Sequence, residues 1–359
     1  MKIWKIGLVG CGEIAEFTYL PHMHRNKRAK LTACCDIRPE RAKLFREKFG
    51  IEKTFDCMED MLSYGDFDIV MDTASIPAHY ELNMQALRAG KHLYSQKPIG
   101  LTPEQATDMI EAAKEADVKI AASPIHMLRP DIIEAKRLIS CGVIGKPLLA
   151  RAVAAHGGPE YFQYRETDPS WFYEPGAGAL YDLGVHALHQ VTGLLGAAKT
   201  VSCTAAVSEP NRTIRSGAYD GKPIDSSKLF DNYMIHLNFG GGCIADVVTG
   251  FCMKAATASP LEVYGECGSI IFTDDRVNPL KIYIDDKVKK IRGWIQEQPQ
   301  SRPQPEFFQC SCIGDLIESI ETNREPKISA THARHVIEIM CAVEACAKDG
   351  AVRSLTTTF

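Results

Sequence analysis

The most constraining feature of this sequence is a glycine-rich turn between an apolar strand and an amphipathic helix. The strand is expected at residues 5–9 and the helix at 14–26. The turn reads Gly10-Cys11-Gly12-Glu13-Ile14-Ala15. In such a turn the first glycine permits a tight bend, the second lets a pyrophosphate approach the backbone, and the small alanine keeps helix and strand close. The sequence therefore predicts that a dinucleotide binds at the N-terminus of this helix.

The first 125 residues alternate short apolar runs with amphipathic stretches. Strands are expected at 5–9, 29–35, 67–73, 92–95 and 119–122, and helices at 14–26, 39–49, 80–89 and 103–116. Strands that alternate with helices in this way indicate a doubly wound parallel sheet. We therefore predict an α/β protein whose residues 1–125 form a Rossmann domain.

The pattern changes after residue 125. Helices are expected at 131–141, 179–195, 307–322 and 333–348, and strands at 147–155, 201–207, 233–239, 243–251, 261–264, 269–273 and 281–284. The alternation within these strands suits a sheet with one solvated face. Residues 126–359 are thus predicted to form an α/β domain with an open, mainly antiparallel sheet, used for substrate binding and oligomerisation. The polar segment 208–228, rich in Gly, Pro and Asp, is expected to be an exposed excursion.

Composition excludes several classes of protein. The chain is 45% hydrophobic and 24% charged, and 41 Lys and Arg against 45 Asp and Glu give a net charge of −4. This charge balance does not indicate binding to nucleic acid or to an anionic membrane. No apolar run reaches the length of a membrane span. Thirteen scattered cysteines without a Cys-x-x-Cys pair fit reduced thiols. We therefore expect a cytoplasmic protein with a small-molecule partner.

The next strand indicates which dinucleotide binds. Asp36 ends that strand, 24 residues after Gly12. A carboxylate there accepts hydrogen bonds from the adenosine ribose and repels a 2′-phosphate, so NAD is predicted over NADP. Arg38 keeps NADP open as the less favoured choice, because a guanidinium could receive the phosphate. Ile37 lies between them and is counted with the cofactor site.

Five separated motifs resemble one known family, the Gfo/Idh/MocA oxidoreductases, named after glucose–fructose oxidoreductase, inositol dehydrogenase and a rhizopine-catabolism protein. The motifs in the first half are the glycine-rich turn, Gly90-Lys91-His92 and the Lys97-Pro98 pair. Those in the second half are the glycine-rich turn and Asp-x-x-x-His helix at 176–186, with residues 230–233 and 261–269 resembling the family's sheet. The resemblance extends over nearly the whole chain and implies a Rossmann domain that binds NAD.

By this resemblance, Lys97, Asp182 and His186 form the catalytic set. Asp182 and His186 lie four residues apart and so share one helix face. Oxidation of a secondary alcohol requires removal of the hydroxyl proton, which a neutral histidine accepts near working pH. Lys97 would hydrogen-bond the same oxygen. Asp182 would orient His186 or hold a neighbouring hydroxyl.

The sequence departs from the family's pattern near the nicotinamide site. Gln96 stands where a glutamate is common, and Tyr19 where many relatives have histidine. Residues 73–79 lack the usual Thr-Pro pair. The predicted cofactor-binding set is completed by Ser75, Pro77, His79, Gln96, Lys97 and Pro98.

An aromatic segment, residues 161–173, leads into the catalytic helix. It would form a stacking wall for a sugar ring, with ordinary packing as the alternative. The expected substrate-binding residues are His126, Arg129, Tyr161, Arg165, Trp171 and Tyr181. The pairs His186/His189 and His22/His24 have no further ligand placed by sequence, so no metal is expected.

These observations predict an NAD-dependent oxidoreductase that transfers hydride between nicotinamide and a secondary hydroxyl of a sugar, glycoside or cyclic polyol. One alternative is an NAD-assisted glycoside hydrolase, in which a retained cofactor oxidises the glycoside transiently, elimination and hydration follow, and the hydride returns. Another is a non-enzymatic sugar or cofactor sensor, which would not need Lys97, Asp182 and His186. The open sheet predicts a homo-oligomer, a dimer or tetramer, because its broad face must be covered.

Overall fold

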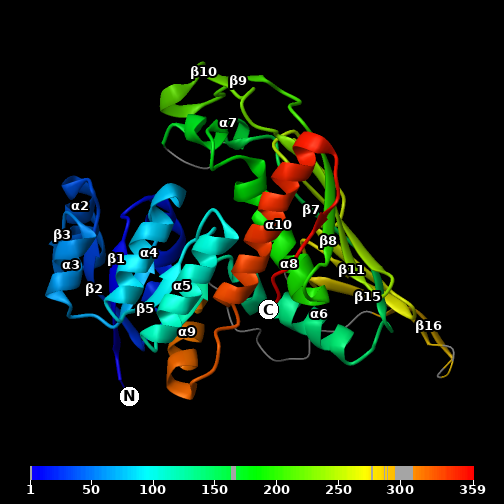
Figure 1. Cartoon of the computed structure of the whole chain (residues 1–359), viewed down its shortest axis with the longest axis horizontal. Coiled ribbons are helices and arrows are strands. Elements are labelled where there is room, and N and C mark those ends of the chain that lie inside the picture. The colour runs from blue at the N-terminus through cyan, green and yellow to red at the C-terminus, as the bar shows by residue number, and fades with distance from the viewer. Residues whose placement is uncertain (1, 163–166, 276–277, 287, 289, 296–309) are drawn as a thin grey trace. The chain divides into compact units, whose positions relative to one another are not determined.

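The computed structural model describes residues 2–162, 167–275, 278–286, 288, 290–295 and 310–359 (Figure 1). Contacts divide these residues into two compact units. The first unit takes in the described residues of Met1–Leu128 and Glu306–Ile337, and the second those of Arg129–Pro305 and Glu338–Phe359. The sequence suggested one boundary, between residues 125 and 126. The described residues of Glu306–Ile337 belong to the first unit as well, so the division of the chain is not a single boundary.

Six parallel strands form the sheet of the first unit within its described residues, in the order β3-β2-β1-β4-β5-β6. The strands are β1 (Trp4–Val9), β2 (Ala29–Cys35), β3 (Lys53–Phe55), β4 (Ile69–Asp72), β5 (His92–Ser95) and β6 (Ile120–Ala122). The α-helices are α1 (Leu20–Met23), α2 (Pro39–Phe49), α3 (Met58–Tyr64), α4 (His79–Arg88), α5 (Pro103–Glu115) and α9 (Ser311–Thr322), and short turns are η2 (Ile76–Ala78) and η3 (Ile125–Leu128). This strand order is that of a doubly wound Rossmann fold.

Local chemistry explains where these helices begin and end. Helix α5 begins after Thr102, whose hydroxyl accepts the Gln105 N–H, and has Pro103 in its first turn. Helix α2 ends at Gly50, which adopts φ +67°. Helix α9 packs against β5 and β6. The sequence analysis had no strand at β3 and no helix at α3.

The sequence suggested an ordinary α-helix after the glycine-rich turn, but the start of this helix is not α-helical. Residues Ile14–Tyr19 form a π-helical turn, η1, before α1. The second site helix shows the same feature, with a π-helical turn η5 (Leu180–Gly184) before α8 (Val185–Leu195). Wider turns of this kind occur frequently at functional sites.

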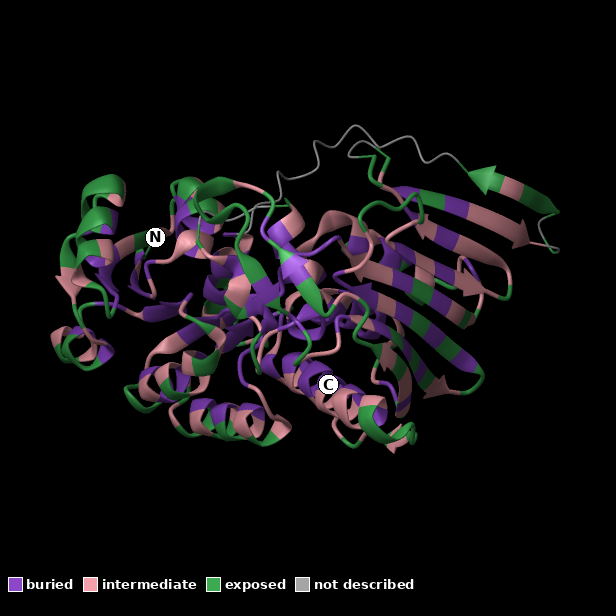
Figure 2. Ribbon diagram, turned by 90° about the horizontal axis from the view of Figure 1, so that it is seen from above, coloured by how far each residue is buried: buried purple, intermediate pink, exposed green. Residues whose placement is uncertain are grey.

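The second unit contains a large open sheet. Nine strands of its described residues follow the order β16-β15-β14-β13-β7-β12-β11-β8-β17, in which β7 and β12 are parallel and the other pairs antiparallel. They are β7 (Pro147–Ala155), β8 (Thr200–Ala206), β11 (Asn232–Gly240), β12 (Cys243–Gly250), β13 (Leu261–Gly265), β14 (Gly268–Phe272), β15 (Leu280–Asp286), β16 (Ile291–Ile295) and β17 (Arg353–Ser354). Figure 2 shows buried and exposed residues alternating along β11 and β12.

Helices cover one face of this sheet. Helix α8 packs against β7 and β12, and α6 (Pro130–Ser140) packs against α8. Further helical elements are α7 (Pro159–Phe162), η4 (Pro169–Tyr173) and η6 (Gly217–Tyr219), and α10 (Ala330–Asp349) passes from the first unit to the second after Ile337. The fold class is therefore confirmed: an α/β protein with a Rossmann unit and a second unit built on an open, mainly antiparallel sheet. The start of the predicted helix 307–322 lies outside the described residues.

The segment 208–228 is mostly exposed, as expected, but it is more ordered than its composition suggested. It forms a small antiparallel sheet of β9 (Asn211–Thr213) and β10 (Pro223–Asp225). Arg212, Ile214, Ile224 and Ser226 are buried. A composition rich in Gly, Pro and Asp predicted the turns correctly, but it concealed alternate residues that point inward.

Candidate functional site

The predicted cofactor residues come together at the carboxyl edge of the first unit's sheet. Strand register sets their level, because Val9 pairs with both Cys35 and Asp72, and Asp72 pairs with Ser95. The loops that follow β1, β2, β4 and β5 therefore begin side by side. They carry Gly10, Gly12, Glu13, Ile14 and Ala15; Asp36, Ile37 and Arg38; Ser75, Pro77 and His79; and Gln96, Lys97 and Pro98. Open α/β sheets bind ligands at this edge, where the strand order reverses.

The two glycines of the first loop have different reasons to be glycine. Gly10 adopts φ +83°, and a Cβ there would lie 2.6 Å from the backbone nitrogen of Ala74. Gly12 does not adopt a positive φ, and a Cβ there would meet nothing within 4 Å. Gly10 thus serves the turn, while Gly12 leaves its backbone open to an incoming pyrophosphate. This arrangement fits the dinucleotide that the motif predicts.

Asp36 lies directly beside this loop. Its side chain is 7% exposed, and its Oδ2 accepts the Cys11 N–H over 2.8 Å. Its Oδ1 accepts the Arg38 N–H over 2.9 Å. The Arg38 side chain is 57% exposed with its Nε 3.5 Å from the Asp36 carboxylate, and Ile37 is 90% exposed. The carboxylate is therefore oriented by the loop, with an apolar side chain next to it in solvent.

An ionic brace that the sequence analysis missed supports the loop. Arg41 donates from Nε to the Cys11 carbonyl over 2.9 Å and from Nη2 to Glu16 over 2.7 Å. Lys48 donates to the other oxygen of Glu16 over 2.8 Å. Burial opposes ionisation of Glu16, but the hydrogen bonds from Lys48 and Arg41 lower its pKa overall. The brace connects the loop, η1 and α2.

His79 fastens two of the loops to each other. It is 1% exposed, and its Nδ1 lies 2.7 Å from the Pro98 carbonyl oxygen while its Nε2 lies 3.0 Å from that of Ala74. Ala74 in turn donates its N–H to the buried Asp72, whose pKa is raised by burial. Ser75 and Pro77 are exposed on the same loop. His79 therefore braces the backbone on which the two exposed residues stand, and its direct contact with cofactor stays a prediction.

Gln96 holds the backbone of Lys97. Its Oε1 accepts the Lys97 N–H over 2.8 Å, and its Nε2 donates to the Tyr19 hydroxyl over 2.7 Å. The Tyr19 and Tyr94 hydroxyls lie 2.6 Å apart. Burial raises the pKa of both tyrosines. The two departures from the family's pattern, Gln96 and Tyr19, are thus direct partners.

Asp182 and His186 belong to the second unit, whereas Lys97 belongs to the first. Gly176 and Gly178 adopt φ +87° and +89° in the turn before η5. The Asp182 N–H bonds the Gly178 carbonyl over 2.9 Å, which starts the helix. Asp182 and His186 are both partly exposed.

Close contact with β12 fixes the position of this helix. The Thr249 hydroxyl donates to the Ala154 carbonyl over 2.8 Å and also lies 3.3 Å from that of Ala179. A Cβ on Gly184 would lie 3.1 Å from the methyl group of Thr249. Four residues make slightly less than one turn where the helix is wide, so Asp182 and His186 still share a face.

His156, which the sequence analysis did not single out, stands near Asp182. Its Nδ1 accepts the Gly158 N–H over 3.0 Å, so a neutral ring carries its proton on Nε2. The ring stacks on Phe251, with centroids 5.3 Å apart and planes at 11°. Burial lowers the pKa of His156, while attraction to Asp182 and Glu160 works in the opposite direction. A strand end with no motif gave no signal for it.

Among the described residues of the segment before η5, two aromatic side chains are exposed. Trp171 is 40% exposed and stacks on the buried Phe172 at 3.8 Å between centroids. Phe162 is 47% exposed and lies edge-on to His156 at 5.4 Å. Phe162 was not among the expected substrate residues. Tyr161, which was, has the guanidinium of Arg215 4.9 Å from its ring.

The other expected substrate residues are less available. Arg129 forms a bidentate ion pair with Asp131. Tyr181 is 5% exposed and its hydroxyl interacts with Glu344, which places the ring in the core of the second unit. His126 lies in η3 and is partly exposed. Arg165 lies outside the described residues. Substrate contact by these four residues stays a prediction.

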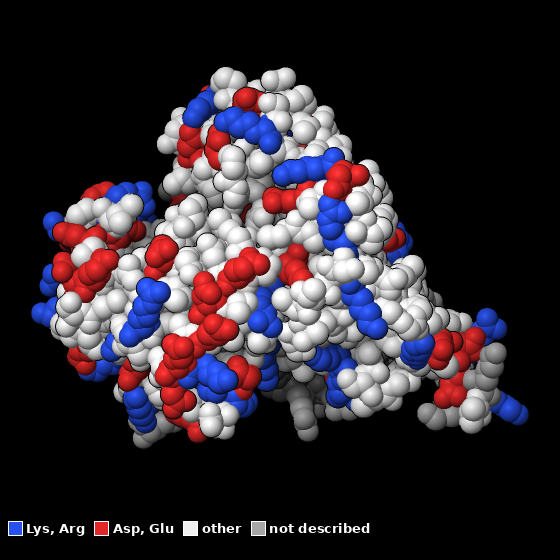
Figure 3. Space-filling view, viewed as in Figure 1, with Lys and Arg blue, Asp and Glu red and all other residues white. Residues whose placement is uncertain are grey.

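A groove of about 510 Å³ lies on the outer side of α4 and α5, lined among others by Tyr80, Asp108 and Glu111, and acidic side chains gather there in Figure 3. Elsewhere on the face drawn, acidic and basic side chains are interspersed. No group of three or more metal-ligating side chains stands together among the described residues. None of the helices described is both long and apolar enough to span a bilayer.

Comparison with known proteins gives the family. Residues 4–123 match an oxidoreductase family with an NAD-binding Rossmann fold, and residues 132–271 match the Gfo/Idh/MocA C-terminal domain. D-glucoside 3-dehydrogenase of Escherichia coli K12 is 25% identical over 288 residues, 79% of this chain and 79% of that protein. Levoglucosan dehydrogenase of Pseudarthrobacter phenanthrenivorans is 25% identical over 278 residues, 72% of this chain and 69% of that protein.

Solved structures share the fold. Levoglucosan dehydrogenase in complex with NADH and levoglucosan superimposes with a TM-score of 0.81 at 20% identity, over 99% of this chain and all of that one. The two family matches follow each other in the order that the motifs predict. The chain therefore belongs to the Gfo/Idh/MocA oxidoreductase family and has an NAD-binding Rossmann domain in its first unit.

Proposed function

We propose that this chain is an NAD-dependent dehydrogenase that oxidises a secondary hydroxyl of a sugar, glycoside or cyclic polyol. One observation carries the proposal: the loops after β1, β2 and β5 hold the open backbone at Gly12, the carboxylate of Asp36 and the backbone-anchored Lys97 along one sheet edge. Gly12 and Asp36 suit the pyrophosphate and the adenosine ribose of NAD. Lys97 follows at the end of β5, the strand beyond β4.

The proposed chemistry uses three side chains on one substrate. Bound NAD would supply the hydride acceptor. His186 accepts the proton of the substrate hydroxyl, and Lys97 donates a hydrogen bond to the same oxygen as negative charge develops on it. Asp182 orients His186 through their shared helix face, or holds a neighbouring hydroxyl. The reverse proton movements apply when the enzyme works as a reductase.

A ring-shaped substrate is supported by the exposed aromatic side chains. Trp171 presents its indole on a firm base of Phe172, and Phe162 presents its ring beside His156. Apolar ring faces of this kind suit the C–H face of a cyclic sugar or polyol, whose hydroxyls point sideways. The relatives named above act on a glucoside and on levoglucosan, both cyclic sugars.

The two alternatives have weaker support. Relatives are named as dehydrogenases and reductases, which does not favour a glycoside hydrolase. A sensor without catalysis would have no use for Lys97, Asp182 and His186 together. The dehydrogenase therefore remains the function that the site supports best.

The test is a substrate panel. The purified protein is given NAD or NADP with free sugars, inositols, 1,6-anhydro sugars and nitrophenyl glycosides, and reduced cofactor and nitrophenol are followed together. The proposal expects reduced cofactor to accumulate with at least one cyclic polyol or sugar, and the activity to be lost in Lys97→Ala and His186→Asn. Nitrophenol release without net reduction would support the hydrolase and refute the proposal.

We also propose a cytoplasmic homo-oligomer. All thirteen cysteines lie in the described ranges and are free thiols, as expected in a reducing compartment. The solvated face of the open sheet exposes Met234 and Ile244, 56% and 50%, with Trp294 at 61% on its edge strand, so self-association would bury apolar area. Light scattering at micromolar concentration tests the assembly, and a monomer would refute it.

A further inference from the structure

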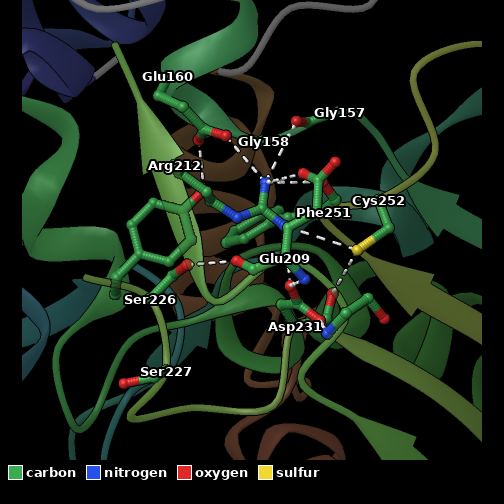
Figure 4. Close-up of polar contacts among 12 residues, drawn as sticks. Gly157, Gly158, Glu160, Glu209, Arg212, Ser226, Ser227, Asp231, Phe251 and Cys252 are labelled. Atoms are coloured by element: carbon green, nitrogen blue, oxygen red, sulfur yellow. Dashed lines mark hydrogen bonds and ion pairs between the residues drawn. The ribbon is translucent and has the colours of Figure 1, made fainter. Parts of the chain in front are cut away.

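Arg212 is a buried cation inside a segment that looks solvent-exposed by composition. Its side chain is 2% exposed. Figure 4 shows its guanidinium surrounded by acceptors from separate parts of the second unit. Nη1 donates to Glu160 over 2.8 Å and to the Phe251 carbonyl over 3.0 Å, and Nη2 donates to Asp231 over 2.8 Å. One side chain of β9 thus joins α7, the residue before β11 and the end of β12.

Two of the three carboxylates around Arg212 are as buried as the arginine, while the third, Glu209, lies 3.2 Å from Nη1 and is 39% exposed. The side chains of Glu160 and Asp231 are 5% and 2% exposed. Burial opposes ionisation of Asp231, but backbone N–H groups of Ser208 and Glu209, together with Arg212, lower its pKa overall. Burial likewise disfavours charge on Arg212, but the carboxylates of Glu160 and Asp231 raise its pKa. Acceptors on both terminal nitrogens, two of them buried carboxylates, hold the guanidinium in one geometry.

The segment 208–228 forms two further ion pairs, with Asp168 and Glu174. Lys222 forms an ion pair with Asp168, which caps η4. Lys228 contacts both oxygens of Glu174, over 2.8 and 3.0 Å. The cations of residues 208–228 therefore meet acids along residues 160–174, one pair buried and two exposed. We call residues 208–228 the clamp.

The elements held by the clamp are those that present the exposed aromatic rings. Glu160 lies in α7, two residues before Phe162, and it also accepts the Tyr173 hydroxyl. Tyr173 and Phe172 are buried in η4, edge-on to Phe251 at 5.6 and 6.5 Å. Trp171 stands on Phe172 within the same turn. The contacts of Arg212 thus fix both ends of the aromatic segment.

We propose that the clamp, anchored by Arg212, is a specificity element: it holds Phe162 and Trp171 in the positions from which they receive the ring of a cyclic substrate. The inference rests on the proposed function and deepens it. Arg212 is a positioning residue, since it touches neither substrate nor cofactor but sets the place of side chains that do. It contributes to binding of the ring in the ground and transition states alike, so its loss appears in KM.

The experiment compares Arg212→Met with Arg137→Met in the full-length protein. Arg137 pairs with Glu134 on the solvent-facing side of one helix, α6, and is a control for loss of an Arg–Glu pair. Arg212→Met is expected to raise KM for the cyclic substrate about tenfold while kcat stays within about threefold. A short acyclic polyol that has no ring to stack, where it is turned over, should show a much smaller change in KM. NAD binding, measured by fluorescence titration, should stay within about twofold of wild type, because the Gly12 loop lies in the other unit.

A second variant guards against misfolding of the first. Lys222→Ala combined with Lys228→Ala removes the two exposed pairs and leaves the buried anchor, so the protein should fold as wild type. It is expected to raise KM for the cyclic substrate by about threefold, with kcat unchanged. If both variants fold and KM is unchanged, or if kcat falls instead for cyclic and acyclic substrates alike, the clamp is merely structural and the inference is overturned. Absence of any wild-type dehydrogenase activity would instead refute the proposed function.

Discussion

The side-chain oxygen of Gln96 accepts the backbone N–H of Lys97 over 2.8 Å. This contact fixes which end of the amide is which, because the acceptor must be Oε1, and Nε2 is left to donate to Tyr19. Tyr19 therefore accepts from Gln96 and is free to donate to Tyr94. A glutamate at position 96 would reverse that direction, since a carboxylate has no proton to give. The neutral amide and the tyrosine thus form a matched pair.

We expect Gln96→Leu to lower kcat/KM by about tenfold to a hundredfold, because a shift of about 1 Å in the backbone of a catalytic lysine is enough for such a loss. Gln105→Leu is the matched control, because Gln105 also accepts a backbone N–H, that of Leu101 over 2.7 Å, but does so on α5. Steady-state kinetics of the two variants and of Gln96→Glu, which keeps the acceptor, test the assignment. Equal losses in the Gln96→Leu and Gln105→Leu variants would contradict it.

Alanine substitutions at the two loop glycines should have different effects, one on stability and the other on NAD binding. Gly10→Ala should destabilise the fold by at least about 1–2 kcal/mol, because φ +83° is unfavourable for a side chain and the new Cβ would press on Ala74. Gly12→Ala should leave the free energy of unfolding unchanged, because its Cβ meets nothing within 4 Å. It should nevertheless weaken NAD binding by about tenfold or more, equal to about 1.4 kcal/mol. Urea unfolding and NAD titration measure the two effects, and wild-type NAD affinity in Gly12→Ala would disprove the cradle.

Asp36 should determine the choice of NAD over NADP. Asp36→Ala removes hydrogen bonds to a charged acceptor, typically about 1.5–3 kcal/mol, and is expected to weaken NAD binding about tenfold to a hundredfold. NADP binding should weaken less or improve, since Arg38 would no longer be held near a carboxylate. Asp108→Ala, on the exposed side of α5, serves as the control. A ratio of NAD to NADP affinity that equals wild type would show that Asp36 does not face the ribose.

His156 should make stability depend on pH. Its pKa is lowered from 6.5 in the folded protein by burial, so below about pH 6.5 the unfolded chain binds the proton first. Its contribution to stability is fully present above pH 6.5 and is lost as pH falls towards the folded pKa. The free energy of unfolding of the wild type should therefore drop more between about pH 7.5 and about pH 5.5 than that of His156→Asn. His92, whose pKa is also lowered by burial, remains in both proteins as a common background.

Local patterns in the sequence were sufficient for the sheet edge that carries the cofactor loops of the first unit. The turn at Gly10–Ala15, the acidic end of β2 and the Lys97-Pro98 pair are each encoded within a few neighbouring residues, and a parallel sheet then aligns them by topology. The alternation in β11 and β12 predicted the open sheet for the same reason. Features that are set by neighbouring residues could therefore be predicted from the sequence.

Features that depend on residues distant in the sequence could not be predicted from local patterns. Arg212 meets Glu160 across 52 residues and Asp231 across 19, and a polar composition hides a cation that becomes buried only when those partners arrive. His156 gains its significance from Asp182 and Phe251. The π-helical turn η5 packs closely on β12, as Gly184 shows against Thr249. Helical periodicity does not distinguish η1 or η5 from α-helix.

The most direct test of the account follows the hydride itself. A cyclic substrate identified by the panel, carrying deuterium on the carbon to be oxidised, is incubated with NAD, and the reduced cofactor is analysed by mass spectrometry. The account predicts one deuterium in reduced nicotinamide for each ketone formed, and loss of this transfer in His186→Asn. Release of an aglycone with no deuterium in free cofactor would contradict it, because the hydride would then have returned to the sugar.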